Sequence, residues 1–167
     1  GDEKVGEGMN LVQSLDYEGA LAQFDEAQAL GENERLVARG RGIAYMGLTD
    51  YEQAIGCFKQ ALAAGSGFPQ PLDYDLNYYL AAAYTKNGQF AEAESAYNAI
   101  LDLKEGEKDA IFLRGNVRLA QSNYEGAKAD FDKVVSMDAK NYDRLIAIYQ
   151  VLEYYGYAEV GQEYLTG

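Results

Sequence analysis

The chain has 167 residues, of which 48% are hydrophobic, and its 14 basic and 27 acidic side chains give a formal net charge of −13. This apolar fraction is enough for one folded domain of ordinary size. No run approaches the roughly twenty apolar residues that a membrane-spanning helix needs. Nucleic acid is not an expected partner, because phosphate backbones are held by clusters of Lys and Arg, and an excess of carboxylates repels polyanions.

The inventory of side chains argues against an enzyme. The sequence has no His, which excludes Ser-His-Asp and Cys-His nucleophile systems and imidazole metal sites. Its one cysteine, Cys57, cannot form an internal disulfide and is interpreted as a small, partly buried apolar residue. No phosphate-binding Gly-rich loop or Ca²⁺-binding loop is present. We therefore expect no catalytic residue, no metal site and no cofactor.

Four copies of one spacing run along the chain. In each copy an Ala is followed four residues later by an aromatic ring, preceded three residues earlier by another ring, and preceded twelve residues earlier by a small residue. The Ala and ring pairs are Ala20/Phe24, Ala54/Phe58, Ala93/Tyr97 and Ala127/Phe131, at steps of 34, 39 and 34 residues. The earlier rings are Tyr17, Tyr51, Phe90 and Tyr124, and the small residues are Gly8, Gly42, Ala81 and Gly115. Such a period predicts stacked two-helix units.

Taken in chain order, the pattern predicts helices over about 3–14, 17–30, 36–48, 51–64, 73–87, 90–103, 108–121 and 124–137. Asp16 is predicted to cap a second helix, and Thr49 with Glu52 and Ser122 with Glu125 read as capping boxes. Asn87-Gly88 supplies a left-handed turn residue. The small residue of each copy is expected to let the two helices approach, with the Ala as the matching gap.

Two segments depart from the repeat. The stretch 65–71 holds both prolines of the chain and is interpreted as a surface loop, the alternative being a hinge or ligand-contacting flap with Phe68 exposed. Residues 142–164 form a looser fifth copy that contains six of the fifteen tyrosines. This end could cap the array or serve as a docking surface.

The four spacings resemble those of the tetratricopeptide repeat, although the family's Trp and late Pro are absent. The resemblance implies an all-α, right-handed α-α superhelix in one domain, 1–167. Its repeats would span about 1–34, 35–68, 74–107 and 108–141, followed by a truncated helical pair or cap over 142–167. It also implies that Arg41 and Arg114, each directly before a glycine, meet carboxylates such as Asp25 and Asp130.

In this family the first helices of the repeats line a groove that receives a peptide or protein segment. Carried over by position, the groove residues would be Arg39, Ile43, Tyr78, Ala82, Phe112, Asn116, Leu119 and Tyr149. Spacings of three and four residues independently place them on one face of each helix. The alternative is that this apolar stripe is simply core.

The expected function is a non-enzymatic scaffold that binds a neutral or basic peptide or protein segment in the groove. Chaperone-binding members grip a C-terminal carboxylate with Lys, Asn and Arg, but the matching positions here are Val5, Met9, Gly40, Asp75 and Tyr79, so we expect no such clamp. The alternative function is an assembly module that self-associates or docks through its Tyr-rich end. The compartment stays open: an exported or lipid-anchored protein whose signal has been removed and a cytoplasmic protein both fit the sequence.

Overall fold

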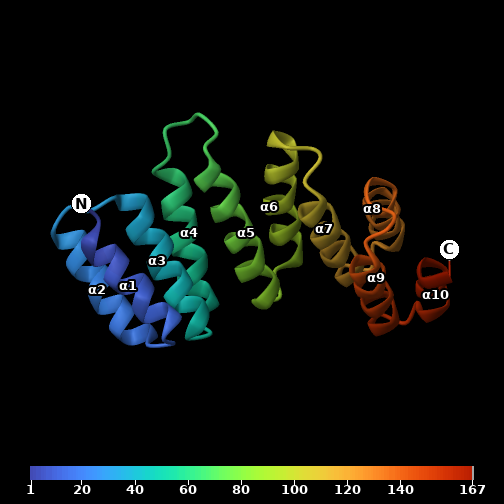
Figure 1. Ribbon diagram of the computed structural model, residues 1–167, viewed down its shortest axis with the longest axis horizontal. Coiled ribbons are helices and arrows are strands. Elements are labelled where there is room, and N and C mark those ends of the chain that lie inside the picture. The colour runs from blue at the N-terminus through green and yellow to red at the C-terminus, as the bar shows by residue number, and fades with distance from the viewer. Residues whose placement is uncertain (167) are drawn as a thin grey trace. The chain divides into compact units, whose positions relative to one another are not determined.

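The computed structural model describes residues 1–166, and every regular element within them is an α-helix (Figure 1). The helices are α1 (Glu3–Gln13), α2 (Tyr17–Ala29), α3 (Glu34–Gly47), α4 (Tyr51–Ala63), α5 (Pro71–Lys86), α6 (Phe90–Leu103), α7 (Lys108–Ala120), α8 (Tyr124–Met137), α9 (Tyr142–Tyr154) and α10 (Ala158–Thr166). All eight helices predicted from the repeat spacing are present, with ends that differ by two residues or fewer. The prediction of an all-α fold is confirmed.

Two compact units divide the chain. The first unit, Gly1–Gln89, holds α1 to α5, and the second unit, which begins at Phe90, holds α6 to α10. Within the first unit each helix packs against the next, and the first helices α1, α3 and α5 are also neighbours. Within the second unit α7 packs against α8 and α9 against α10. The assignment of the whole chain to one domain stays a prediction.

Close packing within the helical pairs depends on contacts between a glycine and an aromatic ring. A Cβ atom added to Gly8 would lie 2.5 Å from Cε1 of Phe24, one on Gly42 would lie 2.4 Å from Cε1 of Phe58, and one on Gly115 would lie 2.6 Å from Cε1 of Phe131. All three rings are fully buried. The small residue of the first helix therefore lies directly against the ring of the second helix, and the expected role of the Ala as the matching gap stays a prediction.

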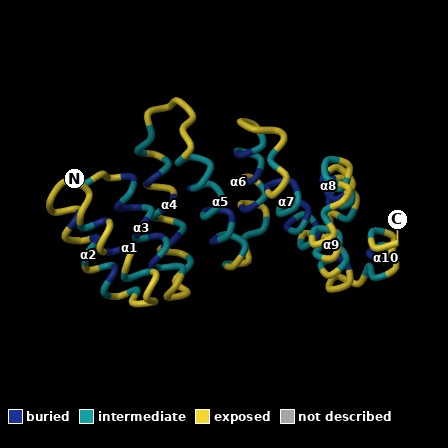
Figure 2. The backbone as a smooth tube through the Cα atoms, in the orientation of Figure 1, coloured by how far each residue is buried: buried dark blue, intermediate teal, exposed yellow. Residues whose placement is uncertain are grey.

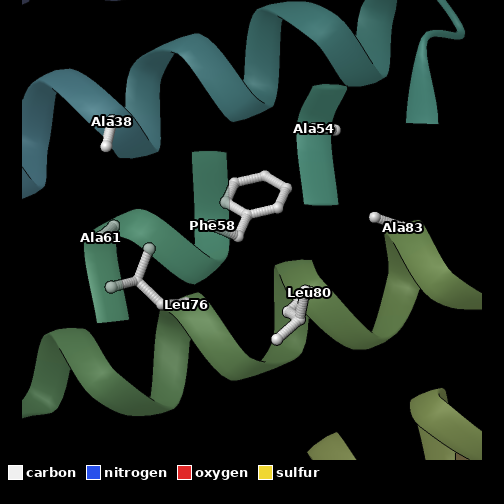
Figure 3. Close-up of a cluster of buried hydrophobic side chains, with 7 residues drawn as sticks. All are labelled: Ala38, Ala54, Phe58, Ala61, Leu76, Leu80 and Ala83. Carbon is white, nitrogen blue, oxygen red and sulfur yellow. The ribbon is translucent and has the colours of Figure 1, made fainter. Parts of the chain in front are cut away.

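Figure 3 shows how one such ring organises the core of the first unit. Phe58 projects from α4 between α3 and α5, and Ala38, Leu76 and Leu80 belong to the same cluster of buried side chains. Its ring stacks on Tyr79 of α5, with the centroids 5.4 Å apart and the planes 20° from parallel. Phe58, on the second helix of its repeat, thus joins the first helix of the same repeat, α3, to the first helix of the next repeat, α5.

The turns between paired helices end in a left-handed residue followed by an N-cap. Thr49 has φ 60° and Ser122 has φ 63°, and the helix caps are the next residues, Asp50 and Asn123, whose side chains accept from the backbone N–H groups three residues on. The capping boxes assigned to Thr49 and Ser122 are therefore wrong. The predicted cap at Asp16 and the left-handed Gly88, φ 76°, are confirmed.

The inserted loop between α4 and α5 projects beyond the helix ends and is largely exposed (Figures 1 and 2). Its Phe68 is 79% exposed. Both ends of the loop are tied to the buried Arg35 of α3, which donates from Nε to the Ala61 carbonyl and from Nη1 to Gln70, at 2.9 Å each, and pairs with Asp73. This anchoring favours the interpretation as a surface loop over a hinge.

Replacement of Gly42 by Ala is expected to lower the free energy of unfolding by about 1–3 kcal/mol, because the added methyl group overlaps the buried Phe58 ring. The matched control is Gly56→Ala on α4, where an added Cβ meets nothing within 4 Å and the stability should rise by about 0.5–1 kcal/mol. Urea unfolding followed by circular dichroism measures both. Equal stability of the two variants would contradict the glycine–ring constraint.

Replacement of Leu15 by Gly is expected to raise the stability by about 0.5–1 kcal/mol, because Leu15 has φ 64° and its side chain is 71% exposed. Leu30 is a matched control at the end of α2, since it is 67% exposed but has φ −83°. Leu30→Gly should lower the stability. Thermal unfolding of both variants tests the prediction, and a loss of stability in Leu15→Gly would contradict it.

Candidate functional site

In the first unit the predicted groove residues lie on neighbouring first helices. Arg39 and Ile43 project from α3, Tyr78 and Ala82 project from α5, and all four are partly buried. Ile43 also packs against the buried cluster around Phe58. These four residues are therefore neither fully in the core nor fully exposed.

Arg39 already has a counter-ion on the adjacent first helix. Its Nε donates to Asp75 Oδ1 at 2.7 Å and its Nη2 to Asp75 Oδ2 at 3.2 Å, and its guanidinium lies 5.3 Å from the centre of the Tyr79 ring. The hydrogen bond to Asp75 raises the pKa of Arg39 above its ordinary value, although burial opposes the shift. Arg39 therefore braces α3 against α5 instead of presenting an unpaired cation.

The positions that would form a carboxylate clamp are otherwise engaged. Val5 is 8% exposed and Gly40 is buried against Phe24. Tyr79 stacks on Phe58, and Asp75 holds Arg39. None of these side chains carries a positive charge toward a ligand.

In the second unit the predicted residues separate into surface and core. Phe112 and Asn116 of α7 and Tyr149 of α9 are partly buried, and the Tyr149 hydroxyl donates to Glu153 at 2.5 Å. Leu119 is 2% exposed and belongs to the core cluster around Phe131. Leu119 therefore presents no surface, and we leave it out of the candidate site.

A hollow of about 480 Å³ lies between α7 and α9, with Phe112 in its lining. The other lining residues are Asp109, Leu113, Asn141, Asp143, Arg144 and Ala147. The guanidinium of Arg144 lies 4.6 Å from the centre of the Phe112 ring and donates to Asp109 at 2.6 Å. Sequence reasoning found Phe112 but missed Asp109 and Arg144, because the ion pair between them joins two helices 35 residues apart and leaves no signal in the spacing of either helix.

Asn116 adds an unused acceptor on the same face of α7, one turn after Phe112. Its Oδ1 is buried, and no described residue donates a hydrogen bond to it. A buried amide oxygen without a donor is costly, which distinguishes Asn116 from its neighbours on this face of α7.

Two other arginines have structural roles, as expected. Arg41 pairs with Asp25 at 2.8 Å, and Arg114 pairs with Asp130 at 2.7 Å. Arg118 joins the second pair through Asp130 at 3.1 Å. The predicted partners of Arg41 and Arg114 are confirmed.

The described residues contain no cluster of His, Cys, Asp and Glu that could hold a metal ion. Over the same range no helix combines the length and apolar character required to cross a bilayer. Burial raises the pKa of the Cys57 thiol, which keeps it protonated at neutral pH.

Comparison with known proteins gives two matches to models described as tetratricopeptide repeat, at residues 39–110 and 109–141. RNA polymerase II-associated protein 3 from Xenopus laevis is 33% identical over 119 residues, which cover 71% of this chain and 16% of that protein. The match thus spans about a sixth of the curated relative's length.

Solved structures extend the likeness to nearly the whole chain. YrrB, described as a TPR protein with an unusual peptide-binding site, has a TM-score of 0.73 at 24% identity over 98% of this chain and 81% of its own. The first TPR of Spaghetti (RPAP3), bound to the HSP90 peptide SRMEEVD, has a TM-score of 0.59 at 27% identity over 72% of this chain and 91% of its own. The α-α superhelix class of fold is therefore confirmed.

Proposed function

Because the chain belongs to the tetratricopeptide repeat family, we propose that it binds a peptide or protein segment along the first helices of its repeats, without catalysing a reaction. The hollow beside Phe112 is the observation that carries this proposal. It is large enough for a ligand side chain, has an aromatic ring in its lining, and has carboxylates at Asp109 and Asp143.

Neighbouring side chains on the same helix face support this assignment. Asn116 lies one turn from Phe112, and its Oδ1 has no hydrogen-bond donor among the described residues. Tyr149, on α9, extends the surface across the next first helix. The first unit has a second stretch of the same kind, formed by Arg39, Ile43, Tyr78 and Ala82. The charge of Arg39 in this stretch is balanced by Asp75.

The ligand that fits this surface is neutral or basic. The chain carries a net charge of −13, and Arg39 and Arg144 are each paired with a carboxylate of a neighbouring first helix. An acidic tail such as the SRMEEVD bound by the Spaghetti repeat would meet no unpaired cation at Val5, Met9, Gly40, Asp75 or Tyr79. We propose that this chain does not hold such a tail.

Peptides selected from a random display library on the wild-type chain are expected to lose at least tenfold in affinity, about 1.4 kcal/mol, for the Ala147→Arg variant. The new side chain fills the hollow beside Phe112 without removing any core packing. Ala129→Arg, an exposed position on α8, is the matched control. Fluorescence anisotropy with labelled peptides measures both.

The same assay includes labelled SRMEEVD, which should show no saturable binding. Unchanged peptide affinity in Ala147→Arg would place the binding surface elsewhere. Tight binding of SRMEEVD would show that another set of cations forms a clamp.

A second candidate function is assembly through the Tyr-rich end. Exposed large apolar side chains gather there: Tyr142, Ile146, Tyr154, Tyr155 and Leu165 are between 38% and 81% exposed. Exposed apolar side chains concentrated in one segment favour an interaction role for that segment.

Self-association through this end predicts that the molar mass measured by light scattering rises with concentration. The double variant Ile146→Ser with Tyr154→Ser should remove the rise, because both side chains are exposed and contribute little to folding. Phe68→Ser, at an equally exposed site in the 65–71 loop, is the control. A wild-type chain that stays monomeric throughout would exclude this function.

A further inference from the structure

We propose a second binding site, on the face of α3 that points away from the groove residues, which takes a lysine- or arginine-bearing segment of a partner protein. Arg39 and Ile43 mark the groove face of α3, and Arg41 follows Arg39 by two residues, which is more than half a turn around the helix. Glu34, Val37 and Arg41 share this other face because they are spaced by three and four residues. The site is independent of the proposed groove.

A hollow of about 420 Å³ lies on this face of α3. It is formed by the end of α2, the first half of α3 and Gln60 of α4. Val37 and Ala38 line it and are only 3% and 2% exposed, so they form an apolar floor. The volume falls within the range of about 300–1,000 Å³ that is common for ligand sites.

One wall of the hollow is held in place by an internal network. Arg41 Nη2 donates to Asp25 at 2.8 Å and to Gln28 Oε1 at 2.5 Å. Both Gln28 and Arg41 line the hollow, so their positions are fixed before any ligand binds. A preformed wall of this kind lowers the entropy cost of binding.

The rim of the hollow has a negative balance of charge. Glu32 is fixed there because its two carboxylate oxygens accept from the backbone N–H groups of Lys4 and Val5, at 3.0 Å each. Glu34 stands exposed in the first turn of α3. The charge of Arg41 is offset by Asp25, and neither Glu32 nor Glu34 forms an ion pair with a described residue, so the rim keeps a negative charge.

An apolar floor with an anionic rim suits the side chain of Lys or Arg. The aliphatic stem lies on Val37 and Ala38, while the charged head reaches Glu32 and Glu34. Space remains for an apolar neighbour of the basic residue. The chemistry therefore selects a short basic and apolar protein segment over an acidic one.

The test uses the full chain labelled with ¹⁵N and the peptide acetyl-Gly-Lys-Leu-Lys-Gly-amide, with the same peptide carrying Gln in place of Lys as the neutral comparison. Backbone amide signals of Gly31, Val37 and Gln60 are expected to shift with a dissociation constant of about 1 mM, as suits a short peptide. The neutral peptide should bind at least threefold more weakly. Equal binding of the two peptides, or no shift at these amides, would overturn the proposal.

Charge variants test the rim directly. Glu34→Lys should weaken binding of the Lys peptide about tenfold, and the gentler Glu34→Gln about threefold. Glu52→Lys, in the first turn of α4 and exposed, makes the same change of net charge away from the hollow and should leave the shifts at Gly31, Val37 and Gln60 nearly intact.

Equal weakening in Glu34→Lys and Glu52→Lys would show nonspecific attraction and overturn the proposal. Shifts confined to Ile43 and Ala82 would assign the peptide to the groove and overturn it as well. Ala147→Arg separates the two sites, because it blocks the hollow of the second unit and leaves this one unchanged.

Discussion

Contact between a buried phenylalanine and glycines of first helices sets the distances between helices on which the remaining structure depends. Phe24 shows this most directly, because a Cβ atom on either Gly8 or Gly40 would lie 2.5 Å from its ring. One ring therefore fixes both the spacing inside its own repeat and the spacing to the next first helix. In the first unit α1, α3 and α5 are neighbours, and the proposed groove lies along these helices.

The repeat period made the helices predictable, while the turns depended on information that the period does not contain. A ring and an Ala recurring at a fixed step give both the number of helices and their register. The cap assignment at Thr49 failed because two adjacent polar residues, Thr49 and Asp50, can each cap a helix by composition alone. The backbone decides between them: Asp50 N–H donates to the Tyr45 carbonyl at 2.9 Å, which closes the end of α3 and leaves Thr49 in the left-handed conformation.

Helical spacing predicted which face of a helix a candidate residue occupies, but it did not predict the ion pairs around that residue. Helical spacing correctly placed Phe112 on a partly buried face, and the structure adds the hollow beside it. Arg39 looked like a cation for a ligand, yet its partner Asp75 lies 36 residues away on another helix. Ion pairs across such separations depend on how repeats are stacked, which the sequence of one repeat does not encode. Leu119 was assigned to the surface for the same reason, although it lies in the core of the second unit.

The arginines of this chain join helices through ion pairs with carboxylates, and these pairs determine the charge that the surface presents to a ligand. All six arginines pair with a carboxylate of another helix: Arg35 with Asp73, Arg39 with Asp75, Arg41 with Asp25, Arg114 with Asp130, Arg118 with Glu94 and Arg144 with Asp109. Each arginine lies on a first helix, so the arginines nearest the proposed groove already have counter-ions. The remaining acidic excess is carried by side chains outside these pairs, among them Glu34 and Asp143. A partner that supplies its own cations, as proposed, would gain attraction at both hollows without breaking any of these six pairs.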